Sequence, residues 1–349
     1  MGKVVVVGSG VIGLSCALYF ALEGEKVQVI TRNPQEATSW VAGGMLAPFS
    51  EGLEGELFDF SYESLKAYPQ FVELLQEVSG RRVDLWRGGI YRLVLAGEEE
   101  LLEVGRHYAE RGHKVEVLQP MELSGLSEEV RWILHYQEEA WVDVEQLMEA
   151  LMSALKRLGA EFTIDSIREV HRQEDRVLEL RGLVSTYGGD FYLFATGAWT
   201  GELFNLPVCP IKGQAIKLRD AYLDRVHYSS ASYLIPRAGY LYVGATSEDV
   251  GFLPGNTLEG LKKLSEGALR VAPFLSRALV KEVLYGYRPS TPDGKPIFEV
   301  GENYLIATGH YRNGILHAPI TGQIALEYLK GSSSPFLKSF SSRRFLTKA

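Results

Sequence analysis

The sequence has few cysteines, no concentration of positive charge and no long apolar run. Its two cysteines, Cys16 and Cys209, form neither a CxxC motif nor a metal-ligand spacing. A net charge of −8 without a basic cluster argues against a nucleic-acid partner. We therefore expect no disulfide framework, no metal site, no nucleic-acid partner and no membrane span. Because a core-like strand begins within three residues of the first, we also expect no signal peptide and a cytoplasmic location.

The strongest local motif lies at residues 4–13. Four consecutive valines predict a strand buried on both faces, and Gly8, Gly10 and Gly13 follow with the spacing GxGxxG. The first glycine of that motif allows a tight turn, the second lets backbone approach a pyrophosphate, and the third lets helix and strand pack closely. The apolar run at 14–22 predicts a helix whose N-terminus faces the phosphates. We predict a dinucleotide site, and a glycine-rich turn without a ligand is the alternative.

The end of the second predicted strand, residues 27–30, departs from the dinucleotide pattern. That pattern places an Asp or Glu here to bind the adenosine ribose, whereas this chain has Thr31 followed by Arg32. A threonine hydroxyl forms fewer and weaker hydrogen bonds to a ribose than a carboxylate does. Arg32 instead suits a 2′-phosphate, so a phosphorylated nicotinamide cofactor competes with the other dinucleotides at this point.

Residues 37–48 are small, hydroxylated and glycine-rich, with neither helical nor strand periodicity. They form either a plain connection or a cofactor loop. In the second case Thr38 and Ser39 donate to phosphates, and Gly43 and Gly44 let the backbone approach a flat ring.

The secondary-structure pattern changes along the chain. A βαβ start is followed by helix and strand signals to residue 199, then by many short strands over 207–283. The last part returns to the opening style, with a strand at 304–309 and a helix that begins near Gly314, because Pro319 is tolerated in a first turn. We expect a cofactor domain assembled from separated pieces, with a second sheet domain inserted between them.

Several blocks of sequence resemble the D-amino-acid-oxidase family of FAD-dependent oxidoreductases and follow one another in the family's order. The resemblance is greatest to the glycine-oxidase branch of that family, which is linked to thiamine biosynthesis. The blocks cover nearly the whole chain and lie at residues 8–13, 38–39 with 42–46, 195–199, 212–214, 233–237, 244–246, 288–296 and 309–314. The resemblance favours FAD over NADPH.

The resemblance implies a mixed α/β and α+β fold, in which a Rossmann-like FAD-binding domain carries an inserted antiparallel-sheet substrate domain. The FAD domain is expected at 1–80, 140–205 and 286–349, and the substrate domain at 81–139 and 206–285. It also implies backbone contacts to the pyrophosphate, a ribose contact, an adenine contact and a wrap around the flavin pyrimidine. The cofactor residues are then Gly8, Gly10, Val11, Ile12, Gly13, Thr31, Arg32, Thr38, Ser39, Gly43, Gly44, Met45, Ile167, Thr196, Gly197, His310, Tyr311, Arg312, Asn313, Gly314, Ile315 and Leu316.

The resemblance further implies a substrate site built on Arg288, Tyr233, Arg312 and Ser247, the first three of them catalytic. Arg288 has a structural alternative, an ion pair with Asp293. Neither cysteine is near Arg288 in the sequence, so FAD is expected to be non-covalent. His310 and His317 fit a structural role better than a catalytic one, because the seven histidines form no triad.

The implied reaction is oxidation of glycine or another small amino acid by hydride transfer to flavin N5. The products are an imino acid or glyoxylate, ammonia and, with dioxygen as acceptor, hydrogen peroxide. The reaction would supply thiamine thiazole synthesis. A D-amino acid or sarcosine/proline-type dehydrogenase with another electron acceptor is the first alternative, and a non-catalytic flavoprotein subunit is the second. The sequence leaves a homo-oligomer open.

Overall fold

The computed structural model describes residues 2–348. Its α-helices are α1 (Val11–Leu22), α2 (Gly55–Ser79), α3 (Leu101–Glu110), α4 (Val144–Arg157), α5 (Thr200–Phe204), α6 (Leu258–Val271), α7 (Gly314–Leu329) and α8 (Pro335–Ser339). Short 3₁₀ turns include η2 (Thr38–Val41), η4 (Gly197–Trp199) and η6 (Tyr311–Asn313). Within the described residues, no helix is both long and apolar enough to cross a membrane.

The strands are β1 (Lys3–Val7), β2 (Lys26–Thr31), β3 (Met45–Leu46), β4 (Leu85–Arg87), β5 (Ile90–Leu95), β6 (Val115–Leu118), β7 (Val130–Tyr136), β8 (Ala140–Val142), β9 (Glu161–Ile164), β10 (Ile167–Gln173), β11 (Arg176–Gly182), β12 (Thr186–Tyr187), β13 (Phe191–Phe194), β14 (Cys209–Arg219), β15 (His227–Tyr228), β16 (Tyr233–Arg237), β17 (Tyr240–Gly244), β18 (Leu279–Ser290), β19 (Ile297–Gly301) and β20 (Tyr304–Thr308). They form four sheets.

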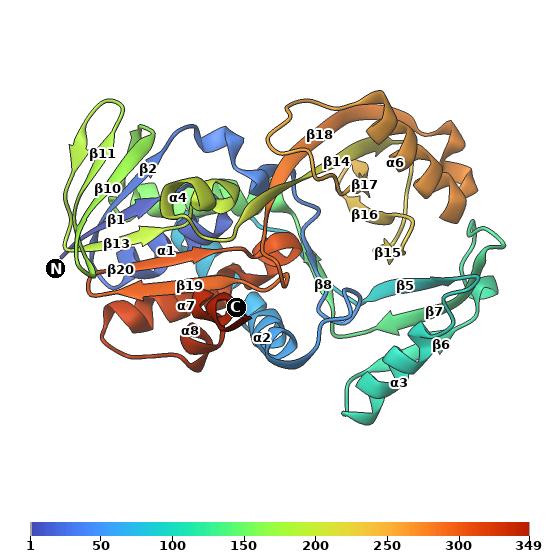
Figure 1. The fold of residues 1–349 in the computed structure, drawn as a ribbon. Coiled ribbons are helices and arrows are strands. Elements are labelled where there is room, and N and C mark those ends of the chain that lie inside the picture. The colour runs from blue at the N-terminus through green and yellow to red at the C-terminus, as the bar shows by residue number, and fades with distance from the viewer. Residues whose placement is uncertain (1, 349) are drawn as a thin grey trace.

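A six-stranded sheet in the order β19-β20-β13-β1-β2-β9 carries the glycine motif. All of its neighbouring pairs are parallel except β19 with β20. The valines of β1 are buried, as expected for a central parallel strand covered on both faces. Helices α1 and α7 pack against each other beside this sheet, and α2 packs on α7 (Figure 1). The carboxyl ends of β1, β2, β13 and β20 therefore meet at one edge.

An eight-stranded sheet in the order β18-β14-β17-β16-β15-β5-β7-β6 forms the other main layer (Figure 1). Its pairs are antiparallel except β15 with β5, which are parallel. The two longest strands, β14 and β18, pair along almost their full lengths. Short strands were expected over residues 207–283, and β14 is longer than those patterns suggested.

The expected fold class is confirmed, as a Rossmann-like sheet accompanied by a mostly antiparallel sheet. The domain boundaries stay a prediction. The small sheet β3-β8-β4 joins strands from both expected domains, and β18 continues across the boundary placed at residue 285.

Helix α7 starts at Gly314, as predicted, but the prediction that Pro319 lies in its first turn is wrong. Pro319 is the sixth residue of the helix and lies beyond the first turn. Because proline has no N–H, the carbonyl of Ile315 loses its helical donor, and the hydroxyl of Tyr68 on α2 donates to it at 2.9 Å. Ser64, one turn earlier on α2, donates to the neighbouring carbonyl of Leu316 at 2.6 Å. Helix α2 thus compensates for the proline.

Candidate functional site

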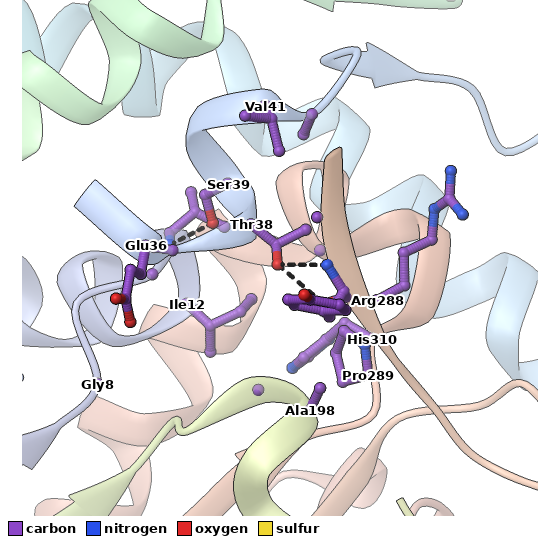
Figure 2. A pocket seen from close by; sticks show the side chains of 18 of the residues that line it. Gly8, Ile12, Glu36, Thr38, Ser39, Val41, Ala198, Arg288, Pro289 and His310 are labelled. Atoms are coloured by element: carbon purple, nitrogen blue, oxygen red, sulfur yellow. Dashed lines mark hydrogen bonds between the residues drawn. The ribbon is translucent and has the colours of Figure 1, made fainter. Parts of the chain in front are cut away.

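A cavity of about 530 Å³ lies where the edge of the six-stranded sheet meets β14 and β18 (Figure 2). It brings together nearly all of the residues predicted for the cofactor and substrate. Those that line it are Gly8, Gly10, Val11, Ile12, Thr31, Arg32, Thr38, Ser39, Gly43, Gly44, Met45, Ile167, Thr196, Gly197, Tyr233, Arg288, His310, Tyr311, Arg312, Asn313, Gly314 and Ile315. Gly13, Leu316 and Ser247 do not line it.

The glycine-rich turn has the geometry expected of a dinucleotide motif. Gly8 has a φ of 112°, and a Cβ there would overlap the carbonyl of Ala195. A Cβ on Gly13 would overlap the carbonyl of Gly8, so this glycine serves the packing of helix on strand and need not reach the cavity. A Cβ on Gly10 would meet only Ser39 Oγ, at 3.5 Å, which leaves open space on the cavity side. The turn therefore offers an exposed backbone cradle at the N-terminus of α1.

Ser39 and Thr38 already use their hydroxyl groups within the protein. Ser39 Oγ accepts from the backbone N–H of Val11 at 2.9 Å and so caps α1 (Figure 2). Thr38 Oγ1 donates to the carbonyl of Tyr287 at 2.9 Å and accepts from the N–H of the same residue at 3.1 Å. In this structure Thr38 therefore ties η2 to β18, and its hydrogen is not available to a phosphate.

The ribose-side residues are also engaged. Thr31 Oγ1 accepts from Ser9 Oγ at 2.8 Å, which leaves the Thr31 hydrogen free to donate. Arg32 forms an exposed ion pair with Glu36 at 2.6 Å and lies 4.8 Å above the ring of Trp199. This placement agrees with a ribose-side position for Arg32, and Glu36 would repel a 2′-phosphate.

Gly43 and Gly44 are required by packing inside the protein. A Cβ on Gly43 would lie 2.7 Å from Cδ1 of Ile235, and Gly44 has a φ of 76°. The buried guanidinium of Arg237 donates to the carbonyl of Gly43. Burial lowers the pKa of Arg237, although nearby tyrosine and carboxylate groups oppose that shift. This loop is thus fixed from the side of the larger sheet.

Arg288 presents a guanidinium without a carboxylate partner among the described residues. Its Nη1 donates to the carbonyl of Thr246 at 3.0 Å. The alternative role, an ion pair with Asp293, is wrong, because Asp293 pairs with Arg344 at 2.8 Å. Figure 2 shows the side chain of Arg288 extending away from the end of the cavity that holds Thr38 and Ser39.

Tyr233 lines the same cavity from β16. Its ring stacks between those of Tyr228 and Tyr242, with centroids 6.0 Å and 6.4 Å away. These stacked rings fix the orientation of Tyr233, and no hydrogen-bond partner is recorded for its hydroxyl within residues 2–348. The hydroxyl is therefore available to a ligand.

Arg312 is already paired, a relationship that the sequence did not suggest. Its Nε and Nη2 donate to the two carboxylate oxygens of Glu51 at 3.0 and 3.1 Å, and Nη2 also donates to the Tyr228 hydroxyl at 3.1 Å. Burial is the largest single effect and lowers the pKa of Arg312, but the charge of Glu51, the neighbouring Tyr228 and Tyr233 and the hydrogen bond to Glu51 together outweigh burial and raise that pKa above its ordinary value. The role of Arg312 in substrate binding stays a prediction, with its guanidinium held by Glu51 here.

His310 and His317 form a buried chain that ends on α2. His310 Nδ1 lies 3.2 Å from His317 Nδ1, and His317 Nε2 lies 2.8 Å from Ser61 Oγ. Burial lowers the pKa of His310 to about 3 and holds that of His317 well below its usual value. Both rings are thus neutral at neutral pH, in agreement with a structural role.

The tertiary structure adds to two expectations from the sequence, one about Cys209 and one about Ser247. Cys209 is remote from Arg288 in the sequence, but it pairs across β14 and β18 with Ser290. Its thiol is exposed and Cys209 does not line the cavity, so this proximity gives no route to a covalent flavin. Ser247 is exposed and lies outside the cavity lining, with its Oγ 3.5 Å from the hydroxyl of Tyr311.

The cavity also contains residues that sequence reasoning did not assign to the site. They include Glu51, Asp165, Trp199, Gly213 and Tyr242. Trp199 and Gly213 belong to sequence blocks that carried the resemblance, so they could have been found. Nothing local to Glu51 or Asp165 marks either as part of a site, because each reaches the cavity through long-range packing.

The cavity suits a dinucleotide cofactor that lies beside an anionic substrate. The open backbone cradle at the N-terminus of α1 fits the cofactor phosphates, and the guanidinium of Arg288 fits the anion. The family model described as "FAD dependent oxidoreductase" matches residues 3–328. The chain belongs to this family, and it is an FAD-dependent enzyme.

Three similar proteins carry more specific names than the family model does. The bifunctional protein ThiO/ThiG of Trichormus variabilis is 34% identical over 99% of this chain and 55% of its own length. Glycine oxidase of Bacillus subtilis is 29% identical, over 92% of this chain and 91% of its own. The crystal structure of glycine oxidase from Geobacillus kaustophilus superimposes with a TM-score of 0.91 at 26% identity, over 98% of both chains. The chain spans about half the length of the bifunctional relatives that it matches.

Proposed function

We propose that the protein catalyses the FAD-dependent oxidation of glycine or another small amino acid. The observation that carries this proposal is Arg288, a cavity-lining guanidinium whose recorded hydrogen bond goes to a backbone carbonyl and not to a carboxylate. A guanidinium binds a carboxylate through two parallel hydrogen bonds. The similarity to proteins named glycine oxidase supports the same substrate class.

Each proposed role follows from a position in the cavity. Arg288 binds the substrate carboxylate, and the hydroxyl of Tyr233 donates a further hydrogen bond to it. Together they fix the Cα–H of the substrate, because two anchoring points restrict rotation of a small molecule. The turn at Gly8 and Gly10 would hold the pyrophosphate of FAD, and the start of α7 at Gly314 would offer positive helix-dipole charge to the negative charge of the reduced flavin.

Bound FAD supplies a hydride acceptor at N5 and a route from reduced flavin to dioxygen. The substrate loses a hydride from Cα and a proton from nitrogen, and water then converts the imino acid to an oxo acid and ammonia. For glycine and one dioxygen the products are glyoxylate, ammonia and hydrogen peroxide. Burial lowers the pKa values of His310 and His317 and makes them weak bases, so we assign them no proton transfer, and an amine that enters deprotonated needs no base from the protein.

The test uses purified holoenzyme with glycine, sarcosine, D-alanine and D-proline. We expect hydrogen peroxide in air and bleaching of the flavin absorbance without oxygen, with glycine among the best substrates. Bleaching without peroxide in air would indicate the dehydrogenase alternative. If none of the four amino acids gives either hydrogen peroxide or flavin bleaching, the proposed function is contradicted.

We further propose that FAD is bound non-covalently, that the product supplies thiamine thiazole synthesis, and that the protein works in the cytoplasm. The similarity to ThiO/ThiG proteins supports the second point. Release of yellow FAD on acid precipitation tests the first. We also propose that the chain divides into an FAD domain and a substrate domain with the boundaries given above. We propose that it forms a homo-oligomer. Limited proteolysis tests those domain boundaries, and sedimentation tests the oligomeric state.

A further inference from the structure

The cavity contains a carboxylate, Glu51, whose role the proposed function leaves unassigned. Glu51 lines the cavity, and its side chain is only 12% exposed. Its two oxygens accept from two nitrogen atoms of Arg312, in the bidentate geometry that guanidinium and carboxylate groups prefer. The pair therefore adds almost no net charge to the cavity.

The backbone around Glu51 is fixed by the fully buried carboxyl group of Glu139. Glu139 Oε1 accepts from the backbone N–H groups of Phe49 and Ser50, both at 2.8 Å, and its Oε2 accepts from Ser50 Oγ at 2.5 Å. The N–H of Glu51 donates to the carbonyl of Ala47 at 3.0 Å. The backbone of Glu51 is thus held in place independently of Arg312, and the carboxylate starts from a fixed point at the cavity wall.

Arg288 and Arg312 reach the cavity from elements that pack against each other, β18 and η6. One guanidinium is neutralised by Glu51, and the other has no carboxylate partner among the described residues. Tyr228 connects the two sides, since its hydroxyl accepts from Arg312 and its ring stacks on Tyr233. At this end the cavity offers one guanidinium for one anionic group.

We propose that Glu51 makes the site selective for substrates with a single anionic group, by occupying Arg312 and repelling a second carboxylate. The inference rests on the proposed function, because it assumes that Arg288 binds the substrate carboxylate. An amino acid with an acidic side chain would place its second negative charge beside Glu51, and like charges at close range are strongly unfavourable. Glu51 therefore excludes dicarboxylic substrates and permits small neutral side chains.

The direct test measures binding of two anions to the FAD-loaded protein, from the change in flavin absorbance. Acetate carries one carboxylate, and malonate carries two. In Glu51→Gln the amide keeps its shape but loses its charge, so Arg312 becomes able to bind the second carboxylate. We expect the dissociation constant of malonate to fall by about tenfold or more, as for a newly formed charge-assisted pair, and that of acetate to change by less than about threefold.

Two further variants define the cause. Glu129→Gln removes an equal charge from an exposed ion pair with Arg270 outside the cavity, and we expect it to leave both dissociation constants unchanged. The double variant Glu51→Gln with Arg312→Gln should lose the gain in malonate binding, because the guanidinium that receives the second carboxylate is gone.

Malonate binding to Glu51→Gln that is no tighter than to the wild type would overturn the proposal. A gain that persists in the double variant would overturn it too. Failure of the proposed function is a different result. The wild-type enzyme would then oxidise no amino acid, while malonate would still bind more tightly to Glu51→Gln than to the wild type and acetate would not.

Discussion

The guanidinium of Arg288 occupies the space beside Gly213, where any other residue would carry its Cβ. A Cβ on Gly213 would come within 2.6 Å of Cζ of Arg288, so a side chain at this position would force the guanidinium to move. Gly213 thus provides the space in which the arginine fork lies. The contact is a diagonal one between β14 and β18, because Gly213 pairs in register with Gly286 and Arg288 pairs with Ile211.

Gly213→Ala should displace Arg288 without removing its charge. We expect kcat/KM for glycine to fall by about tenfold to 100-fold, since a misplaced anchor loses orientation as well as binding. FAD content and melting temperature should stay close to those of the wild type. Gly88→Ala, at a site where a Cβ meets nothing within 4 Å, is the matched control. Unchanged turnover in Gly213→Ala would show that the position of Arg288 does not matter.

Gly10→Val should yield largely apo-protein. The φ of Gly10 is −73°, which valine adopts, so the fold is expected to survive. The added side chain fills the space through which the pyrophosphate approaches the turn. FAD content is measured from the absorbance of protein purified with added FAD, and Gly188→Val, also in open space, is the control. A folded Gly10→Val protein with full FAD content would place the phosphates elsewhere.

Glu139→Gln should change how stability depends on pH. Burial, with a smaller contribution from the charge of Glu51, raises the pKa of Glu139 from its ordinary 4.5 to about 8, against hydrogen bonds from Ser50 and Phe49. Between these two values the folded state holds a proton that the unfolded state has lost. This group therefore lowers the free energy of unfolding as pH rises, by up to about 1.4 kcal/mol per pH unit.

The glutamine cannot ionise, so the stability of Glu139→Gln relative to wild type should increase steadily from pH 5 to pH 8. Urea unfolding of both proteins at several pH values measures that difference. Glu129→Gln, an exposed position, should show no such trend. A constant difference between Glu139→Gln and wild type would mean that Glu139 ionises normally in the folded protein.

Local sequence predicted the parts of the molecule that local physics determines. Gly8 fixes the turn of the GxGxxG motif, because few other residues adopt its φ of 112°. The apolar run after the glycines likewise located α1 to within a few residues. These features depend on neighbours in the chain.

Partners that come from distant segments could not be predicted in the same way. Glu51 and Arg312 are 261 residues apart, and Thr38 and Tyr287 are separated by 249. The compensation of Pro319 by Tyr68 likewise depends on how α2 packs on α7. Each contact results from the tertiary fold, so the sequence alone gave the right residue types without their pairing.

The account depends most on Arg288 as the anchor of the substrate carboxylate, and steady-state peroxide production from glycine tests it most directly. A charge-assisted bidentate pair is worth about 2–4 kcal/mol, so Arg288→Ala should lower kcat/KM by about 30- to 1000-fold. Arg288→Lys should recover part of this, because lysine keeps the charge but loses the fork. FAD content should be unchanged in both variants. A near-normal kcat/KM for glycine in FAD-loaded Arg288→Ala would contradict the account and place the carboxylate elsewhere.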